Sequence, residues 1–446
     1  MRRSLKKICL LLSVAMITCS MVACGNKGGS DSASEGGGNV SDAKDGEFSI
    51  HYLTARSMEE GTIKALMKVA DMYKEEHPDF NFEVESIADR TAYLQKVKIL
   101  ASSDELPEMF DSDADTFFEN LVNDGQIADI DALYNELGVT DKVYDNAKEY
   151  QRLSNGYLGL ICWQANTEYF WYNKKAFEKA NITDTPKTFD EFLEVCEKLK
   201  AAGITPISMA GGITWPPLRY LAFLPFRETG NDFIEKAKVG DESFGSETGM
   251  HAADFMVEVA QYFQPGWNTA DSATAVGLVT SGEVAMTYDG TWQVPFFVDE
   301  NKELKEDIGY FTLPILGEND TTAATDYWAH SGIGTAISQD AMDDNMKDFM
   351  KFVFDHYAEV SMYDFDTLPS FELEDTSGMS DFYKELMDNY SNVKTYGYCW
   401  DVRIDSASNE VLGRETPNLA LGNITPEEWA KRMDDAVAQN VKNNNR

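Results

Sequence analysis

The chain has 446 residues and a strongly acidic composition, with 76 Asp and Glu against 38 Lys and Arg and a formal net charge of −38. Nucleic acid and anionic lipid surfaces carry the same sign of charge, so both are poor partners for this chain. The hydrophobic content of 43% can fill a large core. Single cores seldom grow beyond about 250–300 residues, and we therefore expect two lobes.

The N-terminus has the pattern of an export signal. Basic residues within the first seven positions precede an uncharged apolar stretch, 8–22, which is too short to span a bilayer and leads to the sequence Met-Val-Ala-Cys at 21–24. Cys24 resembles the acceptor cysteine of the bacterial lipobox, whose thiol is joined to a diacylglyceryl group. Two acyl chains suffice for stable anchoring to a membrane. An ordinary signal peptide with an unmodified Cys24 is the alternative.

The residues after Cys24 have the composition of a tether. The segment 25–46 contains no aromatic residue and one aliphatic residue, Val40, so it cannot bury enough surface to offset its chain entropy. We predict a signal peptide at 1–23, a lipidated cysteine with a flexible linker at 24–46, and a folded body outside the cell. The body is then held at the extracellular face of the cytoplasmic membrane.

Cysteine and histidine are too scarce and too scattered for a metal centre. The body has three cysteines, Cys162, Cys196 and Cys399, without a CxxC pair, and its five histidines form no HxxxH or HExxH motif. We expect no metal and no cofactor. The cysteines are expected to be small buried apolar groups, with one optional disulfide as the alternative.

The first part of the body predicts strands that alternate with helices. Alternating apolar residues indicate strands at 47–54 and 80–84 and a short strand at 107–110, and apolar residues at steps of three and four indicate helices at 59–76 and 93–101. Five apolar side chains are assigned to the inner face of the first helix: Ile63, Leu66, Met67, Ala70 and Tyr73. This order is typical of an open parallel sheet with helices on both faces, and hence of an α/β fold.

Ligands of such sheets bind beyond the carboxyl ends of the strands. Polar residues follow all three predicted strands, and we predict ligand contacts from five of them: Arg56, Glu59, Arg90, Asp111 and Asp113. Each of these residues could instead be a helix cap or a surface charge.

The second half of the body continues the alternation. Strands are predicted at 168–172, 204–209 and 283–287, and a helix at 189–202 is expected to begin after Thr188 and to end at Gly203. Two strand ends carry an indole beside glycines, in the loop 210–217 with Trp215 and in the segment 288–292 with Asp289 and Trp292. Glycine allows a ligand to approach the backbone closely.

The ordered landmarks of the chain resemble the extracellular solute-binding proteins of carbohydrate ABC importers, of which the maltodextrin-binding protein is a member. The resemblance covers nearly the whole mature body. Its landmarks are the lipobox, Tyr-Asn-Lys at 172–174, Gly-Glu-Val-Ala-Met at 282–286, Gly-Thr-Trp at 290–292, Phe-Thr-Leu-Pro at 311–314, Gly-Ile-Gly-Thr-Ala-Ile at 332–337 and Thr-Pro-Glu-Glu-Trp at 425–429.

The resemblance implies a two-lobed periplasmic-binding-protein-like fold with a hinge and a ligand cleft between the lobes. An N-terminal lobe would consist of 47–165 plus 316–365, and a C-terminal lobe of 166–315 plus 366–446. The protein would be a monomer that captures a sugar or oligosaccharide, performs no chemistry on it, and delivers it to the permease of an ABC importer.

The resemblance also assigns residues to the sugar. Trp292 corresponds to a sugar-stacking residue, Asp111 and Asp113 to polar contacts of the first lobe, and Trp215 to a comparable loop of the second lobe. Further contacts are implied for these residues: Asn166, Glu168, Trp328, His330, Trp400 and Asp401. Asp289 is predicted to contact the ligand because it is an acid at a strand end, beside a glycine and an indole.

The chemistry of a sugar suits these residue types. A sugar ring has an apolar C–H face and a belt of hydroxyls, so a binding site needs flat aromatic surface and convergent hydrogen-bonding groups. Four other tryptophans are expected to be packing residues of the core: Trp163, Trp171, Trp267 and Trp429.

Two alternative functions remain open from the sequence. The same fold could bind a peptide, a polyamine or a metal ion, and an acidic cleft would suit a cationic solute, although scarce histidine disfavours a metal. A surface glycoside hydrolase that uses Asp111 and Asp113 is the other alternative. It is disfavoured because residues two apart at a strand end need not face each other across a glycosidic bond.

Overall fold

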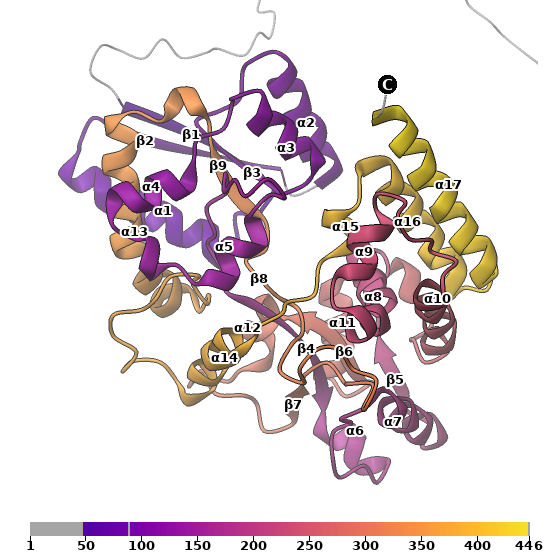
Figure 1. Ribbon diagram of the computed structural model, residues 1–446. Coiled ribbons are helices and arrows are strands. Elements are labelled where there is room, and N and C mark those ends of the chain that lie inside the picture. Colours follow the sequence, from indigo (N-terminus) through magenta and orange to yellow (C-terminus); the bar gives the residue numbers. More distant parts are fainter. Residues whose placement is uncertain (1–47, 88–89, 445–446) are drawn as a thin grey trace, which may run out of the picture. The chain divides into compact units, whose positions relative to one another are not determined.

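Two β-sheets, each with helices packed against it, form the described part of the chain (Figure 1). The computed structural model describes residues 48–87 and 90–444. The predicted α/β class is confirmed, although both sheets are mixed. The predicted signal peptide, Cys24 and the linker lie outside the described residues.

The first sheet has the strand order β2-β1-β3-β9. Strand β1 (Phe48–Thr54) runs parallel to β2 (Phe80–Ser86) and to β3 (Met109–Ser112), as the sequence predicts. Strand β9 (Gly334–Ile337) is antiparallel to β3. The three parallel strands are joined by helical crossovers, whereas β9 enters from the second half of the chain and is free to run the other way.

Helices cover both faces of the first sheet. Successive residues of a strand point to opposite faces, and apolar side chains on each face pack against helices. Ile50 and Tyr52 pack with one core cluster and Leu53 packs with another. Figure 1 shows the helices of the first cluster on one side of the sheet and those of the second cluster on the other. The first set is α1 (Gly61–Glu76), α4 (Ile130–Leu137) and α13 (Asp344–Phe365), and the second set is α2 (Arg90–Ser102) and α3 (Thr116–Asn123).

The second sheet has the order β5-β6-β4-β7, and β8 also pairs with β4. Strand β5 (Thr205–Ser208) is parallel to β6 (Val284–Gly290), in line with the helices that connect them. Strand β4 (Asn166–Asn173) is antiparallel to β6, to β7 (Ile308–Phe311) and to β8 (Ala329–His330). The expected continuation of the parallel pattern therefore does not extend to β4.

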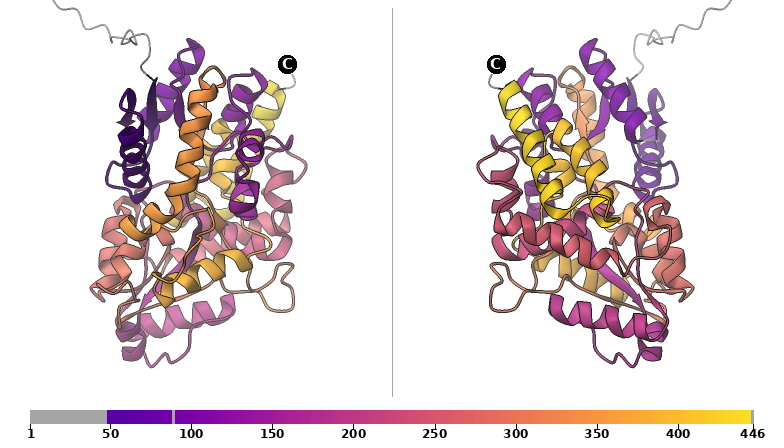
Figure 2. Two further views of the ribbon diagram at one scale, coloured as in Figure 1. Left: turned by 90° about the vertical axis from the view of Figure 1, so that its left-hand side faces the viewer. Right: turned by 90° about the vertical axis from the view of Figure 1, so that its right-hand side faces the viewer.

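The remaining helices belong mainly to the second half of the chain. They are α5 (Asp145–Gln151), α6 (Lys174–Lys179), α7 (Phe189–Ala201), α8 (Trp215–Thr229), α9 (Asp232–Ala237), α10 (Glu247–Ala260), α11 (Ser272–Thr280), α12 (Val294–Phe297), α14 (Asp381–Asn392), α15 (Trp400–Arg403), α16 (Ser406–Ala420) and α17 (Pro426–Asn444). Figure 2 shows α16 and α17, in yellow, side by side, and Arg432 of α17 donates a hydrogen bond of 2.6 Å to Glu415 of α16.

Local sequence signals place several of these elements correctly. Helix α7 begins after Thr188, whose hydroxyl accepts from the backbone of Glu191 while the Glu191 carboxylate accepts from the backbone of Thr188. This capping box satisfies two backbone donors. Gly203 follows the helix with φ +75°, a conformation that favours glycine. The start and the end predicted for this helix are confirmed.

The cores follow the two sheets. Buried residues between 50 and 163, with residues from 336 to 371, surround the first sheet. A larger cluster, drawn mainly from 165–329 and 362–437, surrounds the second. The four tryptophans predicted to be packing residues, Trp163, Trp171, Trp267 and Trp429, are all buried. Cys162, Cys196 and Cys399 are buried free thiols, as expected.

One strand of the first sheet and one helix packed against it differ in detail from the sequence prediction. Strand β3 covers Met109–Ser112 rather than 107–110, because it pairs with β9 through Asp111 and Ser112. The sequence pattern places Met67 on the inner face of α1, but Met67 is 38% exposed and Val69 is fully buried instead.

The described ranges contain no helix with the length and apolar character needed to cross a bilayer. Within the same ranges, no three side chains of His, Cys, Asp or Glu come together as a metal site.

Candidate functional site

Five of the predicted site residues surround one arginine that the sequence analysis did not single out. Arg219, in the second turn of α8, is 5% exposed. The residues around it come from segments far apart in the chain: Glu168 of β4, Trp215 of α8, Trp292, His330 of β8 and Asp401 of α15. We call this set, with Arg219, the Arg219 cluster.

The centre of the cluster is a buried network of charges. The Nε of Arg219 lies 3.0 Å from both carboxylate oxygens of Glu168, and its Nη1 lies 3.2 Å from Oδ1 of Asp401. Glu168 is fully buried. Burial by itself would raise the pKa of Glu168, but the charge of Arg219 and the hydrogen bond from His330 lower it, so this carboxylate is ionised at neutral pH.

His330 completes the network from the opposite side. Its Nε2 lies 3.0 Å from Oε1 of Glu168, and its Nδ1 accepts a hydrogen bond of 3.0 Å from the backbone N–H of Gly332. Because Nδ1 is the acceptor, the proton of a neutral imidazole resides on Nε2 and is donated to Glu168. The carboxylate is thus held between two donors and has a fixed orientation.

Two half-buried indoles lie over this network. The rings of Trp215 and Trp292 meet edge to face, with centroids 5.6 Å apart and planes at 80°. The guanidinium of Arg219 lies 5.0 Å from the Trp215 ring centroid, and the Trp292 ring lies 5.7 Å from the ring of His330. The charged network therefore holds two aromatic surfaces that are only partly covered by protein.

The end of β6 fixes the position of Trp292. A Cβ atom on Gly290 would lie 2.1 Å from the Trp292 ring, so only glycine lets the indole lie against the backbone here. Asp289 is buried, and its carboxylate accepts from the backbone N–H of Gly290 and from Nε2 of Gln293. Burial, opposed by these hydrogen bonds, raises the pKa of Asp289 to about 7.

Asn166 lies beside the cluster at the start of β4. It pairs with His330 in the sheet register, and its Oδ1 lies 3.4 Å from the hydroxyl of Thr291. The Asn166 amide also donates to Gln164. Asn166 and Asp289 thus connect the cluster to the backbone of β4 and β6.

The predicted residues of the first sheet form a separate group. Asp111 is 1% exposed, and its two oxygens accept from Tyr52, Thr54, Arg56, Thr335 and the backbone N–H of Ala55. The pair of Arg56 and Asp111 is fully occupied by protein partners and joins β1, β3 and β9. Its contact with a ligand remains a prediction.

The other predicted residues are more scattered. Arg90 forms an ion pair with Asp113, and the exposed Glu59 lies 2.8 Å from Lys64. Trp328 and Trp400 are buried, against Phe223 and Phe226 in one case and Phe233 and Phe244 in the other. The structure does not bring these residues into the Arg219 cluster.

Sequence reasoning missed Arg219 and Tyr150. A single arginine in the apolar helix stretch LRYLAFLPF, one helical turn after Trp215, is a signal of a buried charge that needs partners. Tyr150 lies in the short helix α5, and its ring packs 5.2 Å from that of His330. Nothing in its local sequence marks this contact.

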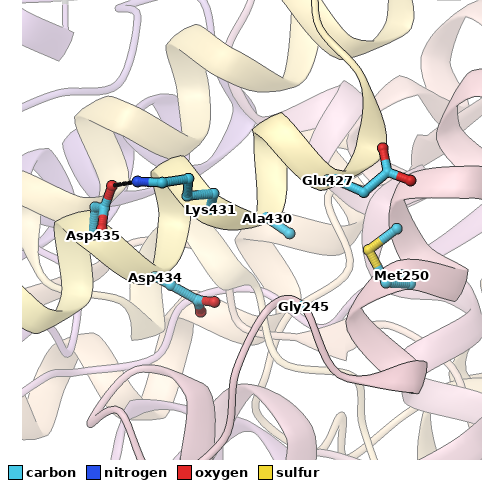
Figure 3. Close-up of a pocket in the computed structure, with 7 residues that line it drawn as sticks. All are labelled: Gly245, Met250, Glu427, Ala430, Lys431, Asp434 and Asp435. Carbon is cyan, nitrogen blue, oxygen red and sulfur yellow. Dashed lines mark hydrogen bonds and ion pairs between the residues drawn. The ribbon is translucent and has the colours of Figure 1, made fainter.

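A surface cavity of about 460 Å³ lies elsewhere, between α10 and α17 (Figure 3). Figure 3 shows Lys431 turned toward Asp435, which it contacts at 2.5 Å, and Met250 facing α17 from α10. Asp434 caps the loop before α10 by accepting from Ser243 and from the backbone of Phe244. None of the predicted site residues lines this cavity.

The Arg219 cluster is suited to binding rather than to bond breaking. The carboxylates of Glu168 and Asp401 are held in place by Arg219 and His330, so they are hydrogen-bond acceptors in fixed positions. The two indoles and the fixed polar groups beside them can hold a flat or ring-shaped solute.

Comparisons with known proteins find relatives that match most of the chain. A protein of Pyrococcus horikoshii, described as an uncharacterised ABC transporter extracellular-binding protein, is 25% identical over 318 residues, or 70% of each chain. The multiple sugar-binding protein of Streptococcus mutans is 22% identical over 387 residues, or 82% of each chain. The solved structure of a chitin oligosaccharide binding protein matches 89% of this chain and 99% of its own, with a TM-score of 0.76 at 22% identity.

The family model that matches is that of the bacterial extracellular solute-binding proteins, and the match runs over residues 58–358. This span includes the second sheet, three of the four strands of the first sheet and every member of the Arg219 cluster except Asp401, and it describes a binding protein rather than an enzyme. The chain therefore belongs to the family of bacterial extracellular solute-binding proteins.

Proposed function

We propose that this protein captures a sugar or oligosaccharide outside the cell and delivers it to the permease of an ABC importer. The family membership supports the role of a binding protein. The sugar-binding names of relatives such as that of Streptococcus mutans support the class of solute. The transporter name of the Pyrococcus horikoshii relative supports the partner.

The observation that carries the proposal is the pair of half-buried indoles over a charged network. Trp215 and Trp292 offer apolar faces of the size of a sugar ring, and Asp401 and Arg219 lie next to them. A sugar would stack its C–H face on one indole, and its hydroxyls would donate to Asp401 and accept from nearby N–H groups. Binding thus needs no change in any covalent bond.

We further propose that capture closes two lobes around the ligand. The lobes are those expected from the sequence, 47–165 plus 316–365 and 166–315 plus 366–446. A ligand that contacts both lobes binds the closed state more tightly and shifts the population toward it. Small-angle scattering that gives the same radius of gyration with and without a bound sugar would contradict closure.

Attachment to the membrane through Cys24 is part of the same proposal. The lipobox pattern supports lipidation, and the linker at 25–46 would let the folded body reach a permease in the same membrane. The anchor would keep a monomeric binding protein near its transporter even where no second membrane retains it.

A thermal-shift screen tests the sugar-binding function. The purified body, residues 47–446, is heated with mono- and oligosaccharides, since a ligand at a hundred times its dissociation constant stabilises the folded state by about 2.7 kcal/mol. We expect a rise in Tm with at least one saccharide. The rise should be lost in Trp292→Ala and kept in Phe296→Ala, a control at an aromatic side chain that is 53% exposed.

Two results would contradict the proposal. A panel without any stabilising saccharide would argue against a sugar, and stabilisation by a polyamine or a basic peptide would favour a cationic solute instead. Equal Tm shifts in the wild type and in Trp292→Ala would place the ligand elsewhere.

A further inference from the structure

Aromatic side chains continue from the Arg219 cluster in an unbroken row. The ring of His330 lies 5.7 Å from Trp292 and 5.2 Å from Tyr150. Tyr150 lies 5.9 Å from Tyr396, which lies 5.6 Å from Tyr398. The middle of this row, at His330 and Tyr150, is buried, whereas Tyr396 and Tyr398 are half-buried, as Trp292 is at the other end. The row therefore has two partly open aromatic ends.

The loop that carries the two tyrosines is held firmly. The Asn231 side chain donates to the carbonyl of Tyr396 and accepts from the backbone N–H of Tyr398, both at 2.9 Å. Between them, Gly397 packs so closely on the buried Trp328 that a Cβ atom would lie 2.7 Å from the indole. These contacts fix the backbone that carries both rings before any ligand binds, and a fixed surface loses little conformational entropy on binding.

Arg403 lies against the same end of the row and has no carboxylate within 4.0 Å among residues 48–87 and 90–444. Its guanidinium lies 4.3 Å from the Tyr398 ring centroid and 6.0 Å from that of Tyr150. Every other arginine in the described ranges has a carboxylate within 4.0 Å: Arg56, Arg90, Arg152, Arg219, Arg227, Arg414 and Arg432.

The donors of Arg403 are also incompletely used. One bond of 3.0 Å runs from Nη2 to the carbonyl of Tyr150, while the buried Nε has no acceptor among the described residues. Leaving a buried donor of a charged group without an acceptor is costly, so such a group is a sign that a partner is missing. An arginine stacked on tyrosine with free donors is suited to the hydroxyls of a sugar.

We propose that Tyr396, Tyr398 and Arg403 form a second saccharide subsite, and that the solute of this protein is an oligosaccharide rather than a monosaccharide. The inference rests on the proposed sugar-binding function. One sugar unit would stack at Trp215 and Trp292, and a later unit of the same chain would contact Tyr398 and Arg403. His330 and Tyr150, which are buried, separate the two ends of the row, so the proposal assigns the ends to different units of one ligand.

Calorimetric titration with ligands of increasing length tests the second subsite. Xylose, glucose and N-acetylglucosamine are titrated together with their β-1,4-linked oligomers of two to four units. We expect the tetramer of at least one series to bind about ten- to a hundredfold more tightly than its monomer, the gain that one charge-assisted contact provides. In Tyr398→Leu and Arg403→Gln this gain should fall to about threefold or less, while the affinity for the monomer stays unchanged.

Control variants separate failure of the subsite from failure of the function. Tyr363→Ala, at an exposed tyrosine on α13, should keep the full dependence on length. Near-UV circular dichroism, which reports fixed aromatic packing, should match the wild type in both subsite variants. Binding that does not strengthen with length, or that strengthens equally in both subsite variants, overturns the subsite and leaves the function intact. No binding of any saccharide to the wild type contradicts both.

Discussion

At the scale of single residues, the buried charge of Glu168 depends on Arg219. The two side chains are 0% and 5% exposed, so neither can be compensated by water if its partner is removed. Arg219 also fixes Asp401 and lies under Trp215. It acts as a positioning residue that joins β4, α8 and α15 at the proposed binding site.

Replacing Arg219 should therefore destabilise the fold strongly. We expect Arg219→Met to lower the free energy of unfolding by about 3–5 kcal/mol, because it leaves Glu168 buried with His330 as its remaining partner. Urea denaturation measures the change. Arg414→Met is a matched control, since this exposed arginine pairs with Glu415 and should contribute less than about 1 kcal/mol. A similar small loss in both variants would show that the cluster carries no buried charge.

Asp289 gives the fold a dependence on pH. The pKa of Asp289 is raised to about 7 in the folded protein, well above that of an aspartate in an unfolded chain. Over the pH range between these two pKa values, the carboxyl of Asp289 is therefore protonated in the folded state and ionised in the unfolded state. The contribution of Asp289 to stability should be largest below about pH 4 and should fall as pH rises toward 7, with no further loss above that value.

The variant Asp289→Asn isolates the contribution of Asp289 to the pH dependence of stability. Between pH 4.5 and pH 7.5, the free energy of unfolding of the wild type should fall by on the order of 2–4 kcal/mol more than that of the variant. The reason is that the amide of the variant carries no charge at either pH. Urea denaturation at the two pH values gives the difference. Identical pH profiles for the two proteins would mean that Asp289 is already ionised in the folded state.

At the scale of elements, the junction of β6 with the turn after it holds Trp292. We expect Gly290→Ala to displace the indole, because the added Cβ would lie 2.1 Å from its ring. The variant should lose most of its saccharide affinity and change its tryptophan fluorescence. Gly277→Ala on α11 is the matched control, since its Cβ would meet nothing within 4 Å and alanine favours a helix by up to about 1 kcal/mol. Unchanged affinity in Gly290→Ala would contradict a role for the Trp292 position.

The elements that the sequence predicts best are those with local signals. The capping box at Thr188 and the positive φ of Gly203 define α7 without help from the rest of the chain. The edge of β3 could not be placed in this way. Asp111 lies inside the strand because Tyr52 and Thr54 of β1, Arg56 just after β1 and Thr335 of β9 satisfy its oxygens. Such long-range compensation has no local sequence pattern.

The same limit applies to the candidate site. The indoles at 215 and 292, next to glycines at strand ends, are recognisable from the sequence as aromatic binding surfaces. The sequence marks Arg219 as a buried charge but does not name its partners, and it gives no signal for Tyr150 or Arg403, since all three depend on contacts with residues more than fifty positions away. Trp328 and Trp400, which carry the same residue type as Trp292, lie in the core. Burial decides between these roles, and one sequence does not reveal it.

At the scale of the whole molecule, the proposed anchor determines where the protein works. We expect Cys24→Ser to prevent attachment of the diacylglyceryl group, because the hydroxyl cannot form the thioether. The variant should be secreted into the medium or remain as an unprocessed precursor, whereas the wild type stays in the membrane fraction and incorporates radiolabelled palmitate. Equal palmitate incorporation in both proteins would contradict the assignment of Cys24. The saccharide affinity of the purified body, residues 47–446, should not depend on the anchor.

The central claim is that the Arg219 cluster is where a saccharide binds. A crystal structure of the body with an oligosaccharide chosen from the titrations tests it most directly. We predict a sugar ring stacked on Trp292 or Trp215 within hydrogen-bonding distance of Asp401, with a further unit at Tyr398 and Arg403. A sugar bound at another place, such as the cavity between α10 and α17, with both indoles free of ligand, would contradict the account.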